Sequence, residues 1–171
     1  MAVYINRLNG GDITIGSGGG SPAPEGNAET RFTLGDGSAE TYNITGTLDQ
    51  QWMIDNGFID ETDESWIKLI NQVDIGNTVT GIGFRAFLDC DLLGVTIPDS
   101  VTSIGESAFH GCYNLTSVTI PSSVTSIGAL AFELCESLTS ITVLGKTTAQ
   151  AQTLLANASV PEGCTITGEL G

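Results

Sequence analysis

Residues 95–135 read VTIPDSVTSIGESAFHGCYNLTSVTIPSSVTSIGALAFELC, which is nearly two copies of one pattern. A third copy begins upstream at Val79, and the copies start about 22 residues apart. Each copy keeps a valine, an isoleucine, a phenylalanine and a cysteine at fixed places. A fixed period with fixed apolar positions is typical of a solenoid, in which each repeat covers the apolar side of the one before. The four columns are Val79, Val101 and Val124; Ile82, Ile104 and Ile127; Phe87, Phe109 and Phe132; and Cys90, Cys112 and Cys135.

Each repeat is expected to hold two short strands and one tight helical corner. Pro98 and Pro121 directly follow two strand-like triplets, where a proline removes a ladder donor and forces a corner. A second strand-like piece, VTSIG or VTGIG, runs along another wall, and the phenylalanine column lies at the spacing of a short helical turn. We place a one-residue shortening of the first repeat between Leu93 and Val95. The triplets are Val73-Asp74-Ile75, Val95-Thr96-Ile97, Val118-Thr119-Ile120 and Ile141-Thr142-Val143.

These patterns predict a mainly β protein with short helices, built as a parallel β solenoid of about three to four rungs with a cap at each end. Residues 1–15 contain two β-like runs and are expected to form an extended N-terminal docking peptide. Residues 16–28 are a Gly/Ser/Pro tether, 29–72 a strand pair and helical cap, 73–143 the repeats, and 144–171 a C-terminal helix and strand cap.

Two short helices are expected in the caps. Thr47 with Gln50, and Thr147 with Gln150, have the spacing of a capping box at a helix start. Large apolar residues, including Trp52, crowd the stretch just ahead of the repeats, and they predict a cap that shields the first rung. A ligand-binding aromatic cluster is the alternative for this stretch.

The composition excludes several partners. The chain of 171 residues has 20 acidic and 5 basic residues, a balance that disfavours nucleic acids and anionic membrane surfaces. No apolar run approaches the roughly 20 residues of a membrane span. The N-terminal MAVYINRLNGGDITIG lacks the basic and apolar regions of a secretory signal, so we expect no signal peptide and no export by the general secretory route.

No catalytic residue, cofactor or metal ligand set is expected. Three of the four cysteines share one column, which favours reduced thiols in the core, with a disulfide between neighbouring rungs as the alternative. Paired ligands at the short spacing of a zinc site do not occur. The single histidine, His110, shares its column with Leu88 and Glu133, and we expect it to lack the fixed partner that a general base needs. The acidic run at 60–64 lacks the glycine and spacing of a calcium loop.

The string at 95–135 resembles the BspA-like leucine-rich repeat family. It combines the IPxxV turn, the SIGxxAF segment, the cysteine column and the LTSVTI strand in the family's order. The resemblance covers about Val73 to Val143. It implies a curved leucine-rich-repeat solenoid that serves cell-surface adhesion in gut bacteria or forms structural and fibre proteins of their phages. No catalytic residues come with it.

Two sets of residues are candidate contact sites. The outward strand face is small and polar, so it resembles an inert ladder or a flat glycan surface, whereas the variable corner positions are richer in apolar and aromatic groups. The candidate interface residues are Phe84, Arg85, Leu88, Leu92, Tyr113, Leu130 and Leu134. The candidate anchor residues, which would add strands to the edge of a partner, are Val3, Tyr4, Ile5, Leu8, Ile13 and Ile15.

The sequence therefore favours a non-enzymatic binding protein. The expected role is a bacteriophage virion accessory protein, such as a capsid decoration, head fibre or tail-associated protein. It would be held by its N-terminus to capsid or tail proteins and would display the repeats for adhesion to a host surface protein or glycan. A homo-oligomer is compatible with this role. The alternative is a bacterial BspA-type surface adhesin or a cytoplasmic protein-interaction module.

Overall fold

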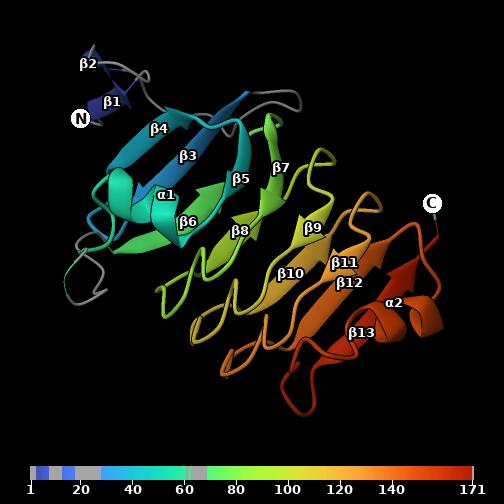
Figure 1. Cartoon of the computed structure of the whole chain (residues 1–171). Coiled ribbons are helices and arrows are strands. Elements are labelled where there is room, and N and C mark those ends of the chain that lie inside the picture. Colours follow the sequence, from blue (N-terminus) through green and yellow to red (C-terminus); the bar gives the residue numbers. More distant parts are fainter. Residues whose placement is uncertain (1–2, 8–12, 18–27, 61, 63–68, 171) are drawn as a thin grey trace.

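Short parallel strands from successive repeats stack side by side in the computed structural model of the chain (Figure 1). The structure describes residues 3–7, 13–17, 28–60, 62 and 69–170, with the backbone alone for the first two ranges. Strands dominate and the helices are short, so the prediction of a mainly β solenoid is confirmed, with about four turns.

The first wall of the solenoid carries the strand triplets of the repeats. Its strands are β6 (Ile70–Asp74), β8 (Gly94–Thr96), β10 (Ser117–Ile120), β12 (Ser140–Leu144) and β13 (Thr165–Glu169). β6 pairs with β8, β10 with β12 and β12 with β13, all in parallel and with each residue opposite its equivalent, as in Val118 opposite Ile141, while β10 lies next to β8. The valines and isoleucines point into the core and the threonines point outward, as the alternation of a strand requires.

The second wall is a four-stranded sheet in the order β11-β9-β7-β5. Its strands are β5 (Gly46–Leu48), β7 (Val79–Ile82), β9 (Ser103–Ile104) and β11 (Ser126–Ile127). A glycine follows each of the last three strands because the rungs approach closely there. A Cβ on Gly105 would lie 2.6 Å from the carbonyl carbon of Gly83, and one on Gly128 would lie 2.4 Å from the amide nitrogen of Glu106.

Two buried columns fill the core between the walls. The rings of Phe87, Phe109 and Phe132 stack with centroids 5.4 and 5.5 Å apart. The thiol of Cys112 donates to the carbonyl of Phe87 in the preceding rung, and that of Cys135 donates to the carbonyl of Phe109. Burial raises the pKa of each thiol in this column, that of Cys135 to about 12, so these groups are protonated core side chains rather than nucleophiles.

The N-terminal cap is built on an antiparallel strand pair, β3 (Glu29–Leu34) and β4 (Ala39–Asn43), which continues the first wall through β6. The hairpin of β1 (Val3–Arg7) and β2 (Ile13–Ser17) extends the same sheet beside β4 (Figure 1). Four aromatic rings pack against one another under this sheet and form the core of the cap; they are Phe32, Tyr42, Trp52 and Phe58.

Helix α1 (Gln50–Asp55) begins differently from its prediction. Asp49 is the N-cap, and its carboxylate accepts from the amide of Trp52 at 3.0 Å. The predicted capping box of Thr47 and Gln50 is therefore wrong, because Asp49 occupies the position from which a side chain reaches the first free amides.

The C-terminal cap covers the last rung from two sides. Helix α2 (Thr148–Leu154) begins with the predicted capping box of Thr147 and Gln150, which is confirmed. Its apolar side and the turn after it bury Ala151, Leu155 and Ala158. The turn also supplies the carbonyls of Asn157 and Ala158 to the amides of Leu130 and Phe132 in the last corner. Strand β13 then closes the first wall beside β12.

The corners between the walls are turns rather than the expected helical segments. Left-handed residues interrupt them at two columns that recur in every rung, and alternating backbone handedness prevents a helix from forming. The first column holds Arg85, Ser107 and Leu130, and the second holds Asp89, Gly111 and Leu134, all with positive φ.

Candidate interaction surface

The corner turns hold their side chains in register from rung to rung. The amide of Arg85 donates to the carbonyl of Glu106 at 3.1 Å, and the amide of Ser107 donates to that of Ala129 at 3.0 Å. The amide of Leu130 makes the same bond to Asn157 in the cap. Because these bonds use only backbone atoms, the corner side chains are free to differ between rungs while their positions stay fixed.

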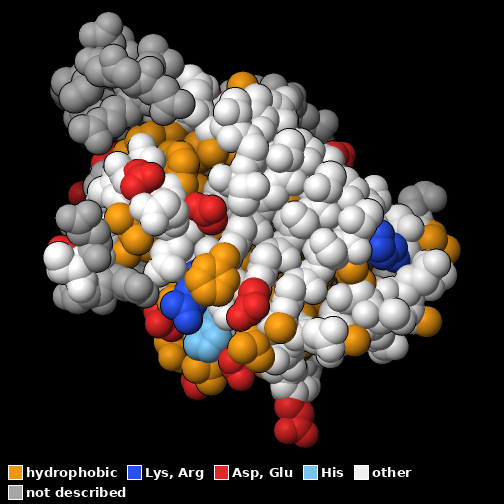
Figure 2. All heavy atoms as spheres, viewed as in Figure 1, with side chains coloured by type: hydrophobic (Ala, Val, Ile, Leu, Met, Phe, Trp, Pro, Cys, Tyr) orange, Lys and Arg blue, Asp and Glu red, His pale blue; other side chains and the backbone are white. Residues whose placement is uncertain are grey.

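Large apolar side chains stand exposed on this corner of three adjacent rungs. They are Phe84, Tyr113, Leu130 and Leu134, each between 37% and 48% exposed. The guanidinium of Arg85 lies over the Phe84 ring at 4.8 Å from its centroid. Figure 2 shows hydrophobic, basic, acidic and histidine side chains gathered in one region of the face in view. We use the name corner surface for six residues: Phe84, Arg85, His110, Tyr113, Leu130 and Leu134.

One of the candidate interface residues lies elsewhere than expected. Leu92 is fully buried and is not available to a partner, whereas Leu88 is half-buried, as Arg85 is. Leu92 takes the core place of Leu115 and Leu138, whereas its neighbour Leu93 is 57% exposed. The shortening of the first repeat therefore falls between Cys90 and Leu92, ahead of its expected place. The hydrogen bond from Asn114 to Asp91 at 2.7 Å shows the same offset.

His110 has partners that the sequence analysis did not expect. Its Nε2 lies 3.2 Å from Oε2 of Glu133 in the following rung, and its Nδ1 lies 3.9 Å from Oδ1 of Asp89 in the preceding rung. The statement that no partner is nearby is wrong, because stacking brings residues about one repeat apart into contact. The two carboxylates face different ring nitrogens, and no group of three or more His, Cys, Asp or Glu among the described residues is arranged to hold a metal ion.

The outward face of the first wall is a polar ladder. The Thr96 hydroxyl donates to Asp74 at 2.8 Å, and the hydroxyls of Thr142 and Thr167 lie 3.3 Å apart. These groups satisfy one another across the rungs and offer little to a protein partner.

The N-terminal candidates form an antiparallel hairpin with Ile5 opposite Ile15. This hairpin pairs with β4 of its own chain through Asn6 and Thr41, so it adds strands to the chain's own sheet. Its docking to another protein stays a prediction. Val3, Tyr4, Ile5, Ile13 and Ile15 lie in β1 and β2, and Leu8 lies outside the described residues.

Comparison with known proteins identifies the repeats. The sequence model of the family described as BspA type leucine-rich repeat region (6 copies) matches residues 65–167. This match covers more than half of the chain and reaches β13, beyond the end of the quoted motifs. None of the curated proteins matches the chain. No helix among the residues described here is long and apolar enough to cross a membrane.

Proposed function

Because the chain belongs to the family of BspA-type leucine-rich repeat regions, which are protein-interaction or adhesion modules, we propose that it binds a protein partner through the corner surface. One observation carries this proposal: Phe84, Tyr113, Leu130 and Leu134 are exposed on one corner, at backbone positions fixed by hydrogen bonds between rungs. Aromatic side chains and arginine contribute most to protein interfaces, and preorganised contacts lose less entropy on binding.

The finer proposal is that the chain is a phage virion accessory protein, either a capsid decoration, a head fibre or a tail-associated protein. The hairpin of β1 and β2 supports this role, because a small β unit joined through residues 18–27 to a repeat domain suits an anchor on a larger assembly. Many anchored copies would gain avidity for a host surface even if each corner surface binds weakly.

Binding by the corner surface is tested with matched serine variants. Beads carrying many copies of the full chain are mixed with host cells and counted by flow cytometry. We expect Phe84→Ser combined with Leu134→Ser to lower cell binding at least tenfold. The control, Leu170→Ser, removes a leucine that is 66% exposed outside the corner surface and should bind like wild type. Loss of binding after protease treatment of the cells identifies a protein partner. Equal binding by the double variant refutes the corner surface.

The virion role is tested separately by removing residues 1–27. In a host that produces the tagged full chain during phage infection, we expect the chain to co-sediment with gradient-purified virions. The shortened chain should stay in the soluble fraction while its circular dichroism spectrum remains that of a folded solenoid. If the shortened chain still co-sediments, the anchor is elsewhere; if neither chain does, the virion role is refuted.

A further inference from the structure

We propose that the open edge of β11 is a docking site for an extended peptide segment of a partner protein, which adds a strand to the sheet β11-β9-β7-β5. The site lies on the second wall at the C-terminal end and is separate from the corner surface.

The C-terminal cap covers the last rung unevenly. Strand β13 continues the first wall, and the turn after α2 pairs with the last corner. On the second wall β11 is the last strand of its sheet among the described residues. The isoleucine column shows the consequence, because Ile82 and Ile104 are fully buried whereas Ile127 is only half-buried. Each of these isoleucines is covered by the next rung, and in the part of the chain that the structure describes no further rung covers Ile127.

The hydrogen bonds between the earlier rungs indicate which residue an added strand needs at the edge of β11. The amide of Thr102 donates to Thr80, and that of Thr125 donates to Thr102, both at 2.9 Å. The hydroxyls of Thr102 and Thr125 donate to the same two carbonyls, at 3.1 and 3.3 Å. The carbonyl of Thr125 is therefore the next acceptor in the series. A threonine in an added parallel strand satisfies it with both its amide and its hydroxyl.

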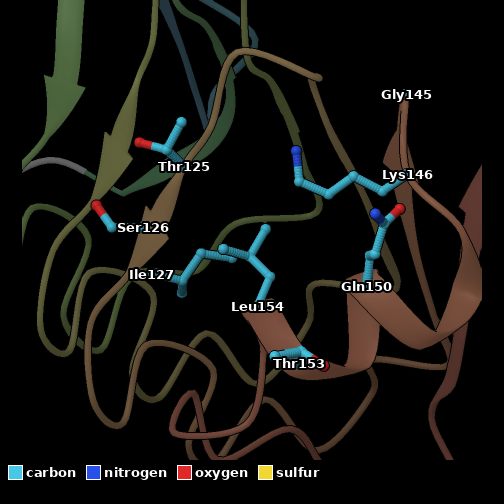
Figure 3. Close-up of a pocket in the computed structure, with 8 residues that line it drawn as sticks. All are labelled: Thr125, Ser126, Ile127, Gly145, Lys146, Gln150, Thr153 and Leu154. Atoms are coloured by element: carbon cyan, nitrogen blue, oxygen red, sulfur yellow. The ribbon is translucent and has the colours of Figure 1, made fainter.

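A groove beside this edge provides the space for such a strand. It has a volume of about 560 Å³, within the range of ligand sites, and it runs between β11 and α2 (Figure 3). In the close-up, the side chains of Ile127 and Leu154 point toward each other across the groove floor. Thr153 lines the helix side. The apolar floor suits an isoleucine two residues after the threonine. Gly105 and Gly128 each lie too close to the preceding rung for a Cβ, so the same position of an added strand requires a glycine.

The charge of Lys146 favours an acidic residue near the N-terminal end of the docked peptide segment. Lys146 lines the groove, and its Nζ donates to the carbonyl of Ser122 at 3.3 Å, three residues ahead of Thr125. It is the only lysine or arginine in the sequence after Arg85, in a part of the chain where acidic residues outnumber basic ones. A carboxylate three residues before the threonine of the added strand lies beside this ammonium group. The occupant is therefore an extended segment with an acidic residue followed by Thr-x-Ile-Gly.

The test uses the full chain and a fluorescent peptide, acetyl-Glu-Ser-Val-Thr-Ser-Ile-Gly-amide, with anisotropy as the readout. We expect saturable binding that the scrambled peptide does not show. Thr153→Trp fills the groove and should weaken binding at least tenfold, while Gln152→Trp, on the exposed side of the same helix, should bind like wild type. Lys146→Gln should weaken the glutamate peptide about threefold and leave its glutamine analogue unchanged at the same salt concentration.

Three results overturn the proposal. They are the absence of saturable binding up to about 1 mM peptide, equal binding of the scrambled peptide, and unchanged binding by Thr153→Trp. Circular dichroism of each variant confirms that the helix and sheet persist, so that a lost signal reports the groove.

Discussion

Truncating two adjacent leucines should have very different effects on stability. Leu92 is fully buried in the core column of Leu115 and Leu138, whereas Leu93 is 57% exposed on the first wall. Leu92→Ala removes the buried side chain and leaves a cavity between stacked rungs, which costs about 3 kcal/mol of the free energy of unfolding. Leu93→Ala removes a side chain that stays mostly in water, and it should cost less than about 0.5 kcal/mol.

The two free energies are compared by urea denaturation, followed by far-ultraviolet circular dichroism and by tryptophan fluorescence. The fluorescence comes from Trp52 in the N-terminal cap and from Trp66, which lies outside the described residues, whereas circular dichroism reports the whole solenoid. Coincident transitions are therefore needed before a single free energy is assigned. A larger loss in Leu93→Ala than in Leu92→Ala would falsify the placement of the shortened repeat between Cys90 and Leu92. That result would instead support a shortening between Leu93 and Val95, where the sequence suggested it.

Three further predictions test a close contact between rungs, a left-handed corner residue and a buried thiol. Gly128→Ala places a Cβ 2.4 Å from the backbone of the preceding rung and should destabilise by about 3 kcal/mol in urea, whereas Gly35→Ala, whose nearest contact is 3.5 Å, should change stability by less than about 1 kcal/mol. Leu134 has a φ of 58°, so Leu134→Gly should be about 1 kcal/mol more stable than Leu134→Ala, and the opposite order contradicts a left-handed corner. Burial raises the pKa of the Cys135 thiol from 9.0 to about 12, so the folded state keeps a proton that the unfolded chain releases. The contribution of this thiol to the free energy of unfolding is fully present below pH 9 and is lost between pH 9 and 12, at about 1.4 kcal/mol per pH unit. The urea midpoint should therefore fall less between pH 8 and pH 10 in Cys135→Ala than in the wild type.

The fixed period of the repeats predicted the fold, because stacking the repeats in register is the one way to bury all the apolar columns. It was less reliable where two neighbours compete for one role. Leu92 and Leu93 are chemically identical, so their order in the sequence does not show which one continues the core column. Thr47 with Gln50 has the spacing of a capping box, but Asp49 between them is a better N-cap at the observed helix start. Between Thr147 and Gln150 the other candidate cap is Thr148, a weaker N-cap residue type than aspartate, and the predicted capping box at Thr147 is confirmed.

The groove and the partners of His110 are features that the sequence did not predict. Both arise from contacts between rungs, so local spacing does not indicate them. Glu133 stands in the same column as His110, and the stacked geometry alone turns that alignment into a contact of 3.2 Å. The open edge at β11 depends on which wall the C-terminal cap covers, and that follows from where β13 pairs.

The two proposed binding surfaces follow from one property of the solenoid. Along the walls the rungs approach so closely that glycine, serine and threonine are favoured, and the polar groups there bond to the adjacent rung. Those positions leave little that a partner can contact. At the corners a series of backbone hydrogen bonds joins the rungs, so large side chains such as Phe84 and Leu134 stand outward without disturbing the stack. A wall becomes able to bind only where the stack ends, because the bonds that each rung makes to the next are then left for another strand. Recognition in this chain is therefore expected at the corners and at the last rung.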